Sequence, residues 1–157
     1  SGWVSNKGKY VNLFKKKINQ FTNSNYAVPT VNGTSALHIS LKLSNVKEND
    51  EVIVPTITYI ATINPILYLK ASPIFLDVSS DFNISVTALK KFINEETFFK
   101  NGCTYNKLSK KKISAIIVTH VFGNAVDIKP ILKICKKRKI KIIEDAAESL
   151  GTFYKKN

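Results

Sequence analysis

The stretch Ile113-Ser114-Ala115-Ile116-Ile117-Val118-Thr119 decides the fold class of this 157-residue chain. It is the strongest strand pattern in the sequence, because aliphatic and β-branched residues follow one another almost without a break. A run of this kind is typical of a central strand in a parallel sheet, where helices cover both faces. The sequence therefore predicts an α/β protein and argues against an antiparallel sandwich or a helical bundle.

The segments on either side alternate between strand and helix patterns. This alternation favours a three-layer sandwich with a mostly parallel sheet and right-handed crossovers. Residues 94–112 are polar and lysine-rich, and we expect a long loop or insertion there. Strands are predicted at residues 26–31, 51–54, 73–78, 113–119 and 140–145, and helices at residues 10–21, 36–43, 61–69, 85–92 and 128–137. Ser85 or Thr87 is the expected N-cap of the fourth helix, and Asp127 is the expected N-cap of the fifth.

The formal net charge of +13 requires an explanation. Such a charge can indicate nucleic acid or an anionic surface as the partner, so a non-catalytic basic binding module is one hypothesis. Almost all of the charge comes from lysine, however, and Arg138 is the only arginine, whereas phosphate and base recognition prefers arginine. We therefore favour solvated lysines on helices and loops, and we expect no nucleic-acid partner.

The remaining composition favours a cytoplasmic protein without a membrane partner. No apolar run approaches the roughly 20 residues of a membrane span, and the first residues lack the pattern of a signal peptide. Cys103 and Cys135 are isolated, with no histidine nearby at metal-ligand spacing. Reduced thiols and no bound metal are expected.

Gly33-Thr34-Ser35 lies between a predicted strand and a predicted helix. Glycine lets a ligand approach the backbone, and the helix N-terminus and the two hydroxyls offer hydrogen-bond donors, an arrangement that suits a phosphate. A turn with an ordinary Thr or Ser N-cap is the alternative, and it is the commoner explanation for this feature alone.

Two further side chains follow predicted strands. Tyr59 comes after the strand at 51–54, where its ring could stack on a flat cofactor; the alternative is a core tyrosine with a satisfied hydroxyl. His120 follows the strand at 113–119 and is either a proton carrier or a residue that bonds loop backbone. His38 lies inside a predicted helix, and we interpret it as structural.

Asp145 ends the last predicted strand, within Glu144-Asp145-Ala146-Ala147-Glu148-Ser149. The carboxyl ends of parallel strands are where ligands bind in open α/β sheets. A buried aspartate there needs a partner. A metal would require more carboxylate or histidine ligands nearby, whereas a cationic ring nitrogen, such as that of pyridoxal phosphate (PLP), needs only this one.

Taken together and in this order, four segments resemble the DegT/DnrJ/EryC1/StrS family of PLP-dependent nucleotide-sugar aminotransferases, which have the fold type I large domain. Gly2-Trp3-Val4-Ser5 also resembles the early segment of that family. The four segments are Asn32-Gly33-Thr34-Ser35-Ala36-Leu37, Pro55-Thr56-Ile57-Thr58-Tyr59-Ile60-Ala61-Thr62, His120-Val121-Phe122-Gly123 and Glu144-Asp145-Ala146-Ala147-Glu148-Ser149-Leu150-Gly151.

The resemblance implies a role for each matching residue. Thr34 and Ser35, after Gly33, match positions that bind the cofactor phosphate. Tyr59 matches the aromatic residue that stacks on the pyridine ring, and Asp145 matches the partner of the ring nitrogen. Glu148 falls where many members carry Gln or His near the phenolic oxygen of the cofactor, so it departs from the common pattern. His120 is expected to support the site.

The implied function is transfer of an amino group from an amino acid, expected to be glutamate, to a 4-keto-6-deoxy nucleotide sugar. The product would be a 4-amino sugar for surface glycans, and the parent enzyme would be a homodimer. A PLP-dependent sugar dehydratase of the same family, with histidine in place of the catalytic lysine, is the alternative.

The family's Schiff-base lysine is expected beyond Asn157. No lysine of this chain lies in the matching context. Residues 1–157 are thus expected to be a partial cofactor-binding large domain without the C-terminal small domain, and to be inactive alone.

Overall fold

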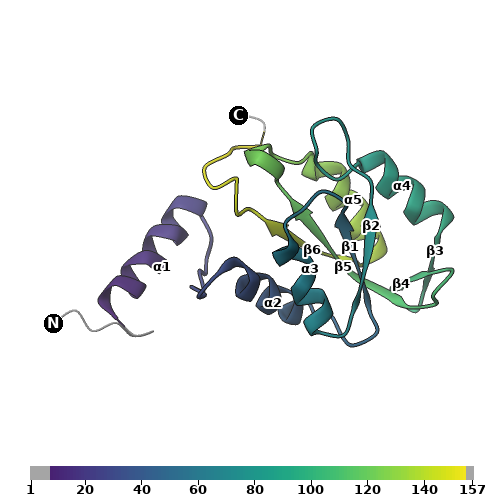
Figure 1. Ribbon diagram of the computed structural model, residues 1–157, viewed down its shortest axis with the longest axis horizontal. Helices are drawn as coiled ribbons and strands as arrows, with labels where there is room; N and C mark the ends of the chain where they lie inside the picture. The colour runs from purple at the N-terminus through teal and green to yellow at the C-terminus, as the bar shows by residue number, and fades with distance from the viewer. Residues whose placement is uncertain (1–7, 155–157) are drawn as a thin grey trace. The chain divides into compact units, whose positions relative to one another are not determined.

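The computed structural model describes residues 8–154, so the Gly2–Ser5 segment lies outside the described residues. The chain divides into two compact units between Asn32 and Gly33. The first contains α1 (Lys9–Thr22). The second contains α2 (Gly33–Leu43), β1 (Glu51–Pro55), α3 (Ile60–Tyr68), β2 (Ser72–Leu76), α4 (Val86–Glu95), β3 (Thr97–Lys100), β4 (Cys103–Asn106), β5 (Lys112–Thr119), the 3-10 helix η1 (Val121–Gly123), α5 (Ile128–Arg138) and β6 (Lys141–Asp145) (Figure 1).

The second unit is built on a mixed, mostly parallel sheet with β5 at its centre. β5 pairs in parallel with β1 on one side and with β6 on the other, and β2 adds a further parallel strand beyond β1. The β3–β4 hairpin joins in antiparallel orientation at the beginning of β5, where Thr104 pairs with Ile113. The α/β class and the mostly parallel sheet predicted from the sequence are confirmed.

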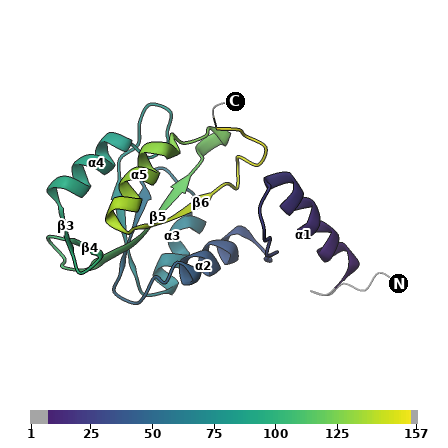
Figure 2. The same ribbon diagram turned by 180° about the vertical axis from the view of Figure 1, so that it is seen from behind.

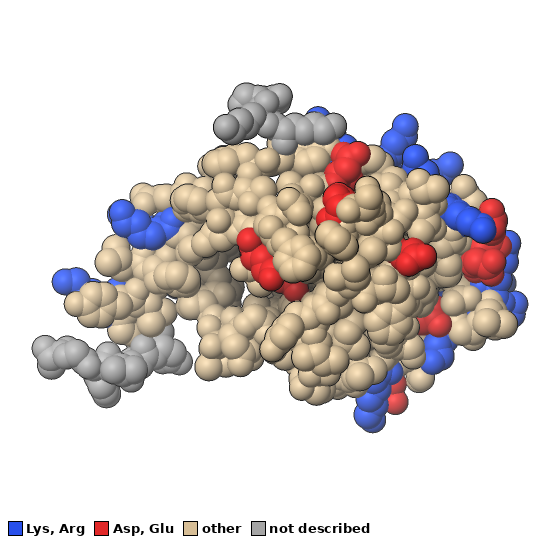
Figure 3. All heavy atoms as spheres, turned by 45° about the horizontal axis from the view of Figure 1, so that its top comes forward, with Lys and Arg blue, Asp and Glu red and all other residues tan. Residues whose placement is uncertain are grey.

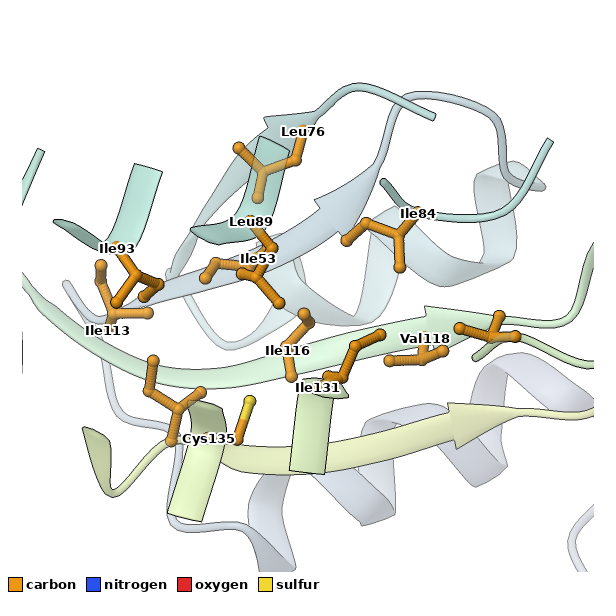
Figure 4. Close-up of a cluster of buried hydrophobic side chains, with 12 residues drawn as sticks. Ile53, Leu76, Ile84, Leu89, Ile93, Ile113, Ile116, Val118, Ile131 and Cys135 are labelled. Atoms are coloured by element: carbon orange, nitrogen blue, oxygen red, sulfur yellow. The ribbon is translucent and has the colours of Figure 1, made fainter. Parts of the chain in front are cut away.

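Helices cover both faces of this sheet and make it the middle of three layers. Successive side chains of β5 point to opposite faces: Ile116 and Val118 join the cluster beneath α4 and α5, whereas Ala115 and Ile117 join the cluster beneath α2 and α3. Figure 4 shows side chains of the first cluster, among them Ile116 of β5, Ile131 of α5 and Leu89 of α4, and Figure 2 shows the layers from behind. Burial on both faces explains why the strand that decided the fold class is apolar without alternation.

The helix boundaries follow local hydrogen bonds. Ser85, and not Thr87, caps α4, since its hydroxyl accepts from Ala88 N at 3.1 Å. Asp127 occupies the N-cap position of α5 but makes no side-chain cap hydrogen bond there. Its carboxylate instead accepts from the hydroxyl of Tyr154, so the predicted cap is right in position and wrong in mechanism.

The predicted strand at residues 26–31 is wrong, since these residues form no regular element. Tyr26, Val28 and Val31 are all exposed. Pro29 cannot donate a backbone hydrogen bond, and a strand is stable only when a neighbouring strand satisfies its backbone groups. In the described part of the unit that ends at Asn32, no strand is present to do so.

Residues 94–112 are not a long loop but contain the β3–β4 hairpin, which corrects the sequence prediction. Asn101 and Gly102 form its two-residue turn, with φ of 51° and 76°. Two positive φ angles in an Asn-Gly pair are typical of a type I′ turn, the commonest connection of a tight hairpin. Asn106 of β4 then donates to the Glu51 carboxylate at 3.0 Å and anchors the hairpin to β1.

Replacing Gly102 with alanine is expected to lower the thermal unfolding midpoint by several degrees. An L-residue held at positive φ costs about 1–2 kcal/mol, and an added Cβ meets nothing within 4 Å, so the effect is that of the backbone alone. Gly33→Ala is the matched control, because the space there is also open and Gly33 is not among the positive-φ glycines. Circular dichroism melts give the unfolding midpoints of both variants. Equal midpoints for Gly102→Ala and Gly33→Ala would contradict the turn assignment.

Candidate functional site

The carboxyl ends of β1, β5 and β6 lie at one edge of the sheet, because these strands are parallel neighbours. The segment Thr56–Tyr59 follows β1, His120 follows β5, and Asp145 ends β6. Thr119, the last residue of β5, is paired in register with Asp145. This edge is where the fold brings sequence-distant polar side chains together.

Asp145 is half-buried and is held by two donors. Its Oδ2 atom accepts from the hydroxyl of Thr62, on α3, at 3.0 Å. Its Oδ1 atom accepts from Ala147 N at 3.3 Å. Each carboxylate oxygen has more than one acceptor position, so Asp145 keeps capacity for a further donor at this edge.

Thr62 belongs to a group of three threonines that sequence reasoning missed. Its hydroxyl oxygen accepts from Thr58 at 2.8 Å, and Thr58 in turn lies 3.1 Å from the Thr119 hydroxyl. Thr62 is fully buried. The three hydroxyls join the loop after β1, the first turn of α3 and the ends of β5 and β6 into one polar network that ends on Asp145.

His120 is buried and has partners at both ring nitrogens. Nδ1 accepts from Val126 N at 3.2 Å, which assigns the ring proton to Nε2. Nε2 then donates to the Glu144 carboxylate at 3.1 Å. Of the two roles considered from the sequence, the contacts match the one in which His120 binds loop backbone. Both residues line a small open cavity of about 100 Å³ that Tyr154 also lines.

Glu148 holds the turn that follows β5. Its carboxylate accepts from Phe122 N at 2.8 Å, and the Thr152 hydroxyl donates to Gly123 O at 2.9 Å. A Cβ at Gly123 would lie 3.1 Å from the carbonyl oxygen of Glu148, and its φ of 78° also favours glycine. The segment that begins at Glu148 is therefore packed closely against the turn.

The predicted phosphate-binding residues open α2, which begins at Gly33. Thr34 and Ser35 lie in its first turn and are half-buried. A Cβ at Gly33 would meet nothing within 4 Å, so there is open space beside this helix end. α2 packs against α3 and contacts β6.

Tyr59 lies at the N-cap position of α3, one residue after Thr58. Its side chain is 77% exposed, so the alternative of a core tyrosine is wrong. Tyr59 directly follows Thr58 of the threonine network that ends on Asp145, and its ring is exposed.

Acidic side chains are interspersed with the basic ones on the side of the molecule that Figure 3 shows. Carboxylates lie over the middle of the view, and lysine and arginine side chains are mixed with further carboxylates at its right-hand end. Within residues 8–154, no three His, Cys, Asp or Glu side chains are grouped to hold a metal ion. Over the same residues, none of the helices combines the length and the apolar character that a bilayer crossing requires.

The Glu144–His120 contact predicts a pH dependence of stability. The hydrogen bond from His120 holds the pKa of Glu144 below its ordinary value of 4.5, with burial acting in the opposite direction. A carboxyl whose folded pKa is lowered stabilises the fold above the unfolded value, and this contribution is lost as the pH falls through the folded pKa. Glu144→Gln should therefore lower the melting midpoint at pH 7 and make a smaller difference below pH 4.5.

Thermal melts across this pH range test the contact. Glu95→Gln is the control, because Glu95 is exposed and its carboxylate makes no hydrogen bond or ion pair within the described residues. If Glu144→Gln lowers the melting midpoint by the same amount at pH 7 and below pH 4.5, the ionised carboxylate does not stabilise the fold.

Comparison with known proteins gives one family. The GDP-perosamine synthase of Escherichia coli O157:H7 is 36% identical over 156 residues, which cover 99% of this chain and 38% of that protein. The structure of a DegT DnrJ EryC1 StrS aminotransferase from Brucella abortus matches with a TM-score of 0.82 and 30% identity, over 92% of this chain and 37% of that one. NtdA from Bacillus subtilis, solved with bound cofactor PMP, matches with a TM-score of 0.78 and 27% identity, over 92% and 30%.

The chain thus spans 30–38% of the length of these proteins. The sequence match to the family covers residues 1–157. This chain belongs to the DegT/DnrJ/EryC1/StrS aminotransferase family.

Proposed function

We propose that this chain is part of the cofactor-binding large domain of a PLP-dependent aminotransferase, and that the complete enzyme transfers an amino group to a 4-keto-6-deoxy nucleotide sugar. The observation that carries the proposal is the position of Asp145. Its carboxylate lies at the carboxyl edge of a parallel sheet, is held there by Thr62, and retains acceptor capacity.

The donor set around Asp145 fits a pyridinium nitrogen better than a metal. One carboxylate with hydroxyl and amide neighbours suits a single charged hydrogen bond from a ring N–H. When bound, PLP supplies an electron sink for chemistry at the carbon that carries the amine. The task of Asp145 is to keep the ring nitrogen protonated, which requires a carboxylate fixed in place.

The start of α2 supports the phosphate end of the same site. The first turn of a helix offers backbone N–H groups without helical partners and the positive end of the helix dipole. Thr34 and Ser35 add hydroxyls to that turn, and the open space at Gly33 lets a phosphate group approach. α2 is 11 residues long and contacts β6, the strand that ends in Asp145.

Tyr59 and Glu148 complete the proposed site. The exposed ring of Tyr59 would stack on the cofactor plane and limit its tilt. Glu148 would act near the phenolic oxygen by holding the turn after β5 through Phe122 N, and His120 would support that turn through Val126 N.

The substrate, donor and assembly belong to the same proposal. A nucleotide sugar is the acceptor, glutamate is the amino donor, and two copies of the enzyme form a homodimer. The relative from E. coli carries the name GDP-perosamine synthase. That name supports amine transfer to a nucleotide-linked sugar over the dehydratase alternative.

Asp145→Asn in the complete enzyme should slow amine transfer while leaving much of the cofactor bound. An amide cannot stabilise the pyridinium as a carboxylate does, and loss of one such electrostatic contact costs about 10²–10³ in rate. Stopped-flow absorbance of the single turnover with glutamate, which converts the PLP form to the pyridoxamine phosphate form, measures the effect.

A double variant of the phosphate site, Thr34→Val with Ser35→Ala, is the contrast. It should weaken cofactor affinity and leave the single-turnover rate of the saturated enzyme within about tenfold of the unsubstituted rate. The hydroxyls of Thr34 and Ser35 would hold the phosphate and would not touch the ring. If Asp145→Asn turns over at nearly the parent rate, Asp145 is not the ring-nitrogen partner and the proposed function is wrong.

A further inference from the structure

The hydroxyls of the three threonines near Asp145 form a row of hydrogen bonds. The number of hydroxyl protons determines which oxygen is the donor in each bond. A hydroxyl has one proton to donate. Thr62 donates its proton to Asp145 Oδ2 at 3.0 Å. Thr58 donates its proton to the Thr62 oxygen at 2.8 Å.

The remaining contact must then run one way. Thr58 and Thr119 lie 3.1 Å apart, and either oxygen could be the donor by geometry alone. Because the single proton of Thr58 is already directed to Thr62, Thr119 must be the donor. The protons therefore all point the same way, from Thr119 through Thr58 and Thr62 to the carboxylate.

From this direction we propose that Thr119, Thr58 and Thr62 are positioning residues that fix Asp145 as an acceptor and set the plane of its carboxylate for the cofactor ring nitrogen. The inference rests on the proposed function and deepens it. Hydrogen bonds in such a chain polarise one another, so the last donor is stronger than an isolated hydroxyl. Each carboxylate oxygen then has one donor within the described residues, Thr62 at Oδ2 and Ala147 N at Oδ1, and keeps a further acceptor position for a ring N–H.

Burial makes this arrangement hard to replace. Thr62 is fully buried, and Thr119 is 9% exposed. Water therefore cannot readily take over their hydrogen bonds, and a buried hydroxyl without a partner costs about 1–3 kcal/mol. The four groups come from the loop after β1, α3, β5 and β6, so any shift between these elements would move the carboxylate.

The first test separates positioning from simple packing. Thr62→Val keeps the shape and removes the hydroxyl, whereas Thr62→Ser keeps the hydroxyl. Thr104→Val is the matched control, because Thr104 is also buried and its hydroxyl also donates within the sheet unit, to Arg138 O, but it lies on β4.

The probes are pyridoxamine 5′-phosphate and its analogue with carbon in place of the ring nitrogen. Neither carries an aldehyde, so neither reacts with the many lysines. Isothermal titration of the complete enzyme, freed of cofactor, gives the ratio of the two dissociation constants. Thr62→Val should reduce the preference for the ring nitrogen about tenfold, equal to about 1.4 kcal/mol, whereas Thr62→Ser and Thr104→Val should retain it.

The outcomes distinguish the two proposals. If the unsubstituted enzyme prefers the ring nitrogen and the Thr62→Val variant keeps that preference, the positioning role is wrong and the proposed function survives. If the unsubstituted enzyme shows no preference for the ring nitrogen, the proposed role of Asp145 is itself wrong.

A second measurement needs no ligand. Thermal melts of Thr62→Val, Asp145→Ala and the double variant form a mutant cycle. Without the carboxylate the Thr62 hydroxyl loses its acceptor, so Thr62→Val should cost far less in the Asp145→Ala background than in the parent. Additive losses would show that the Thr62 hydroxyl does not act through Asp145 and would overturn the inference.

Discussion

The parallel pairing of β5 with β1 and β6 is the constraint on which the rest of this structure depends. It brings the ends of three strands to one edge, with Thr119 in register with Asp145. The pairing is enforced from both faces, because Ile116 and Ile117 are fully buried in opposite clusters. A shift of one residue would exchange the two faces of β5 and would also separate Asp145 from its hydroxyl partners.

The polar edge depends on the apolar sheet beneath it. The sheet holds the strand ends in place, and the threonine hydroxyls bind the Asp145 carboxylate in one orientation. The turn after β5 is fixed separately, by His120 bound to Val126 N and by Glu148 bound to Phe122 N. Loops at the carboxyl edge can therefore carry chemistry while the strands that support them stay in register.

The fold and the site differed in how far the sequence could predict them. Strands with local apolar runs, such as residues 113–119, and residues that follow them, such as Asp145, could be placed from pattern alone. The Asn101-Gly102 turn signal of the hairpin lies in a lysine-rich stretch that resembles a loop. The apolar pattern at residues 26–31 carries no information on whether a pairing strand is present. The Thr62–Asp145 contact joins residues 83 positions apart, and no local pattern in a single sequence reveals such a pair.

In the proposed site, the start of α2, Tyr59 and Asp145 together hold one phosphorylated pyridine at the carboxyl edge. The most direct measurement is an amide NMR titration of this chain with pyridoxamine 5′-phosphate. We expect that the signals which shift first are those of Gly33 to Ala36, Tyr59 to Thr62, and Asp145. Shifts that gather instead on the β3–β4 hairpin or on the lysines of α5, with the carboxyl edge unchanged, would contradict it.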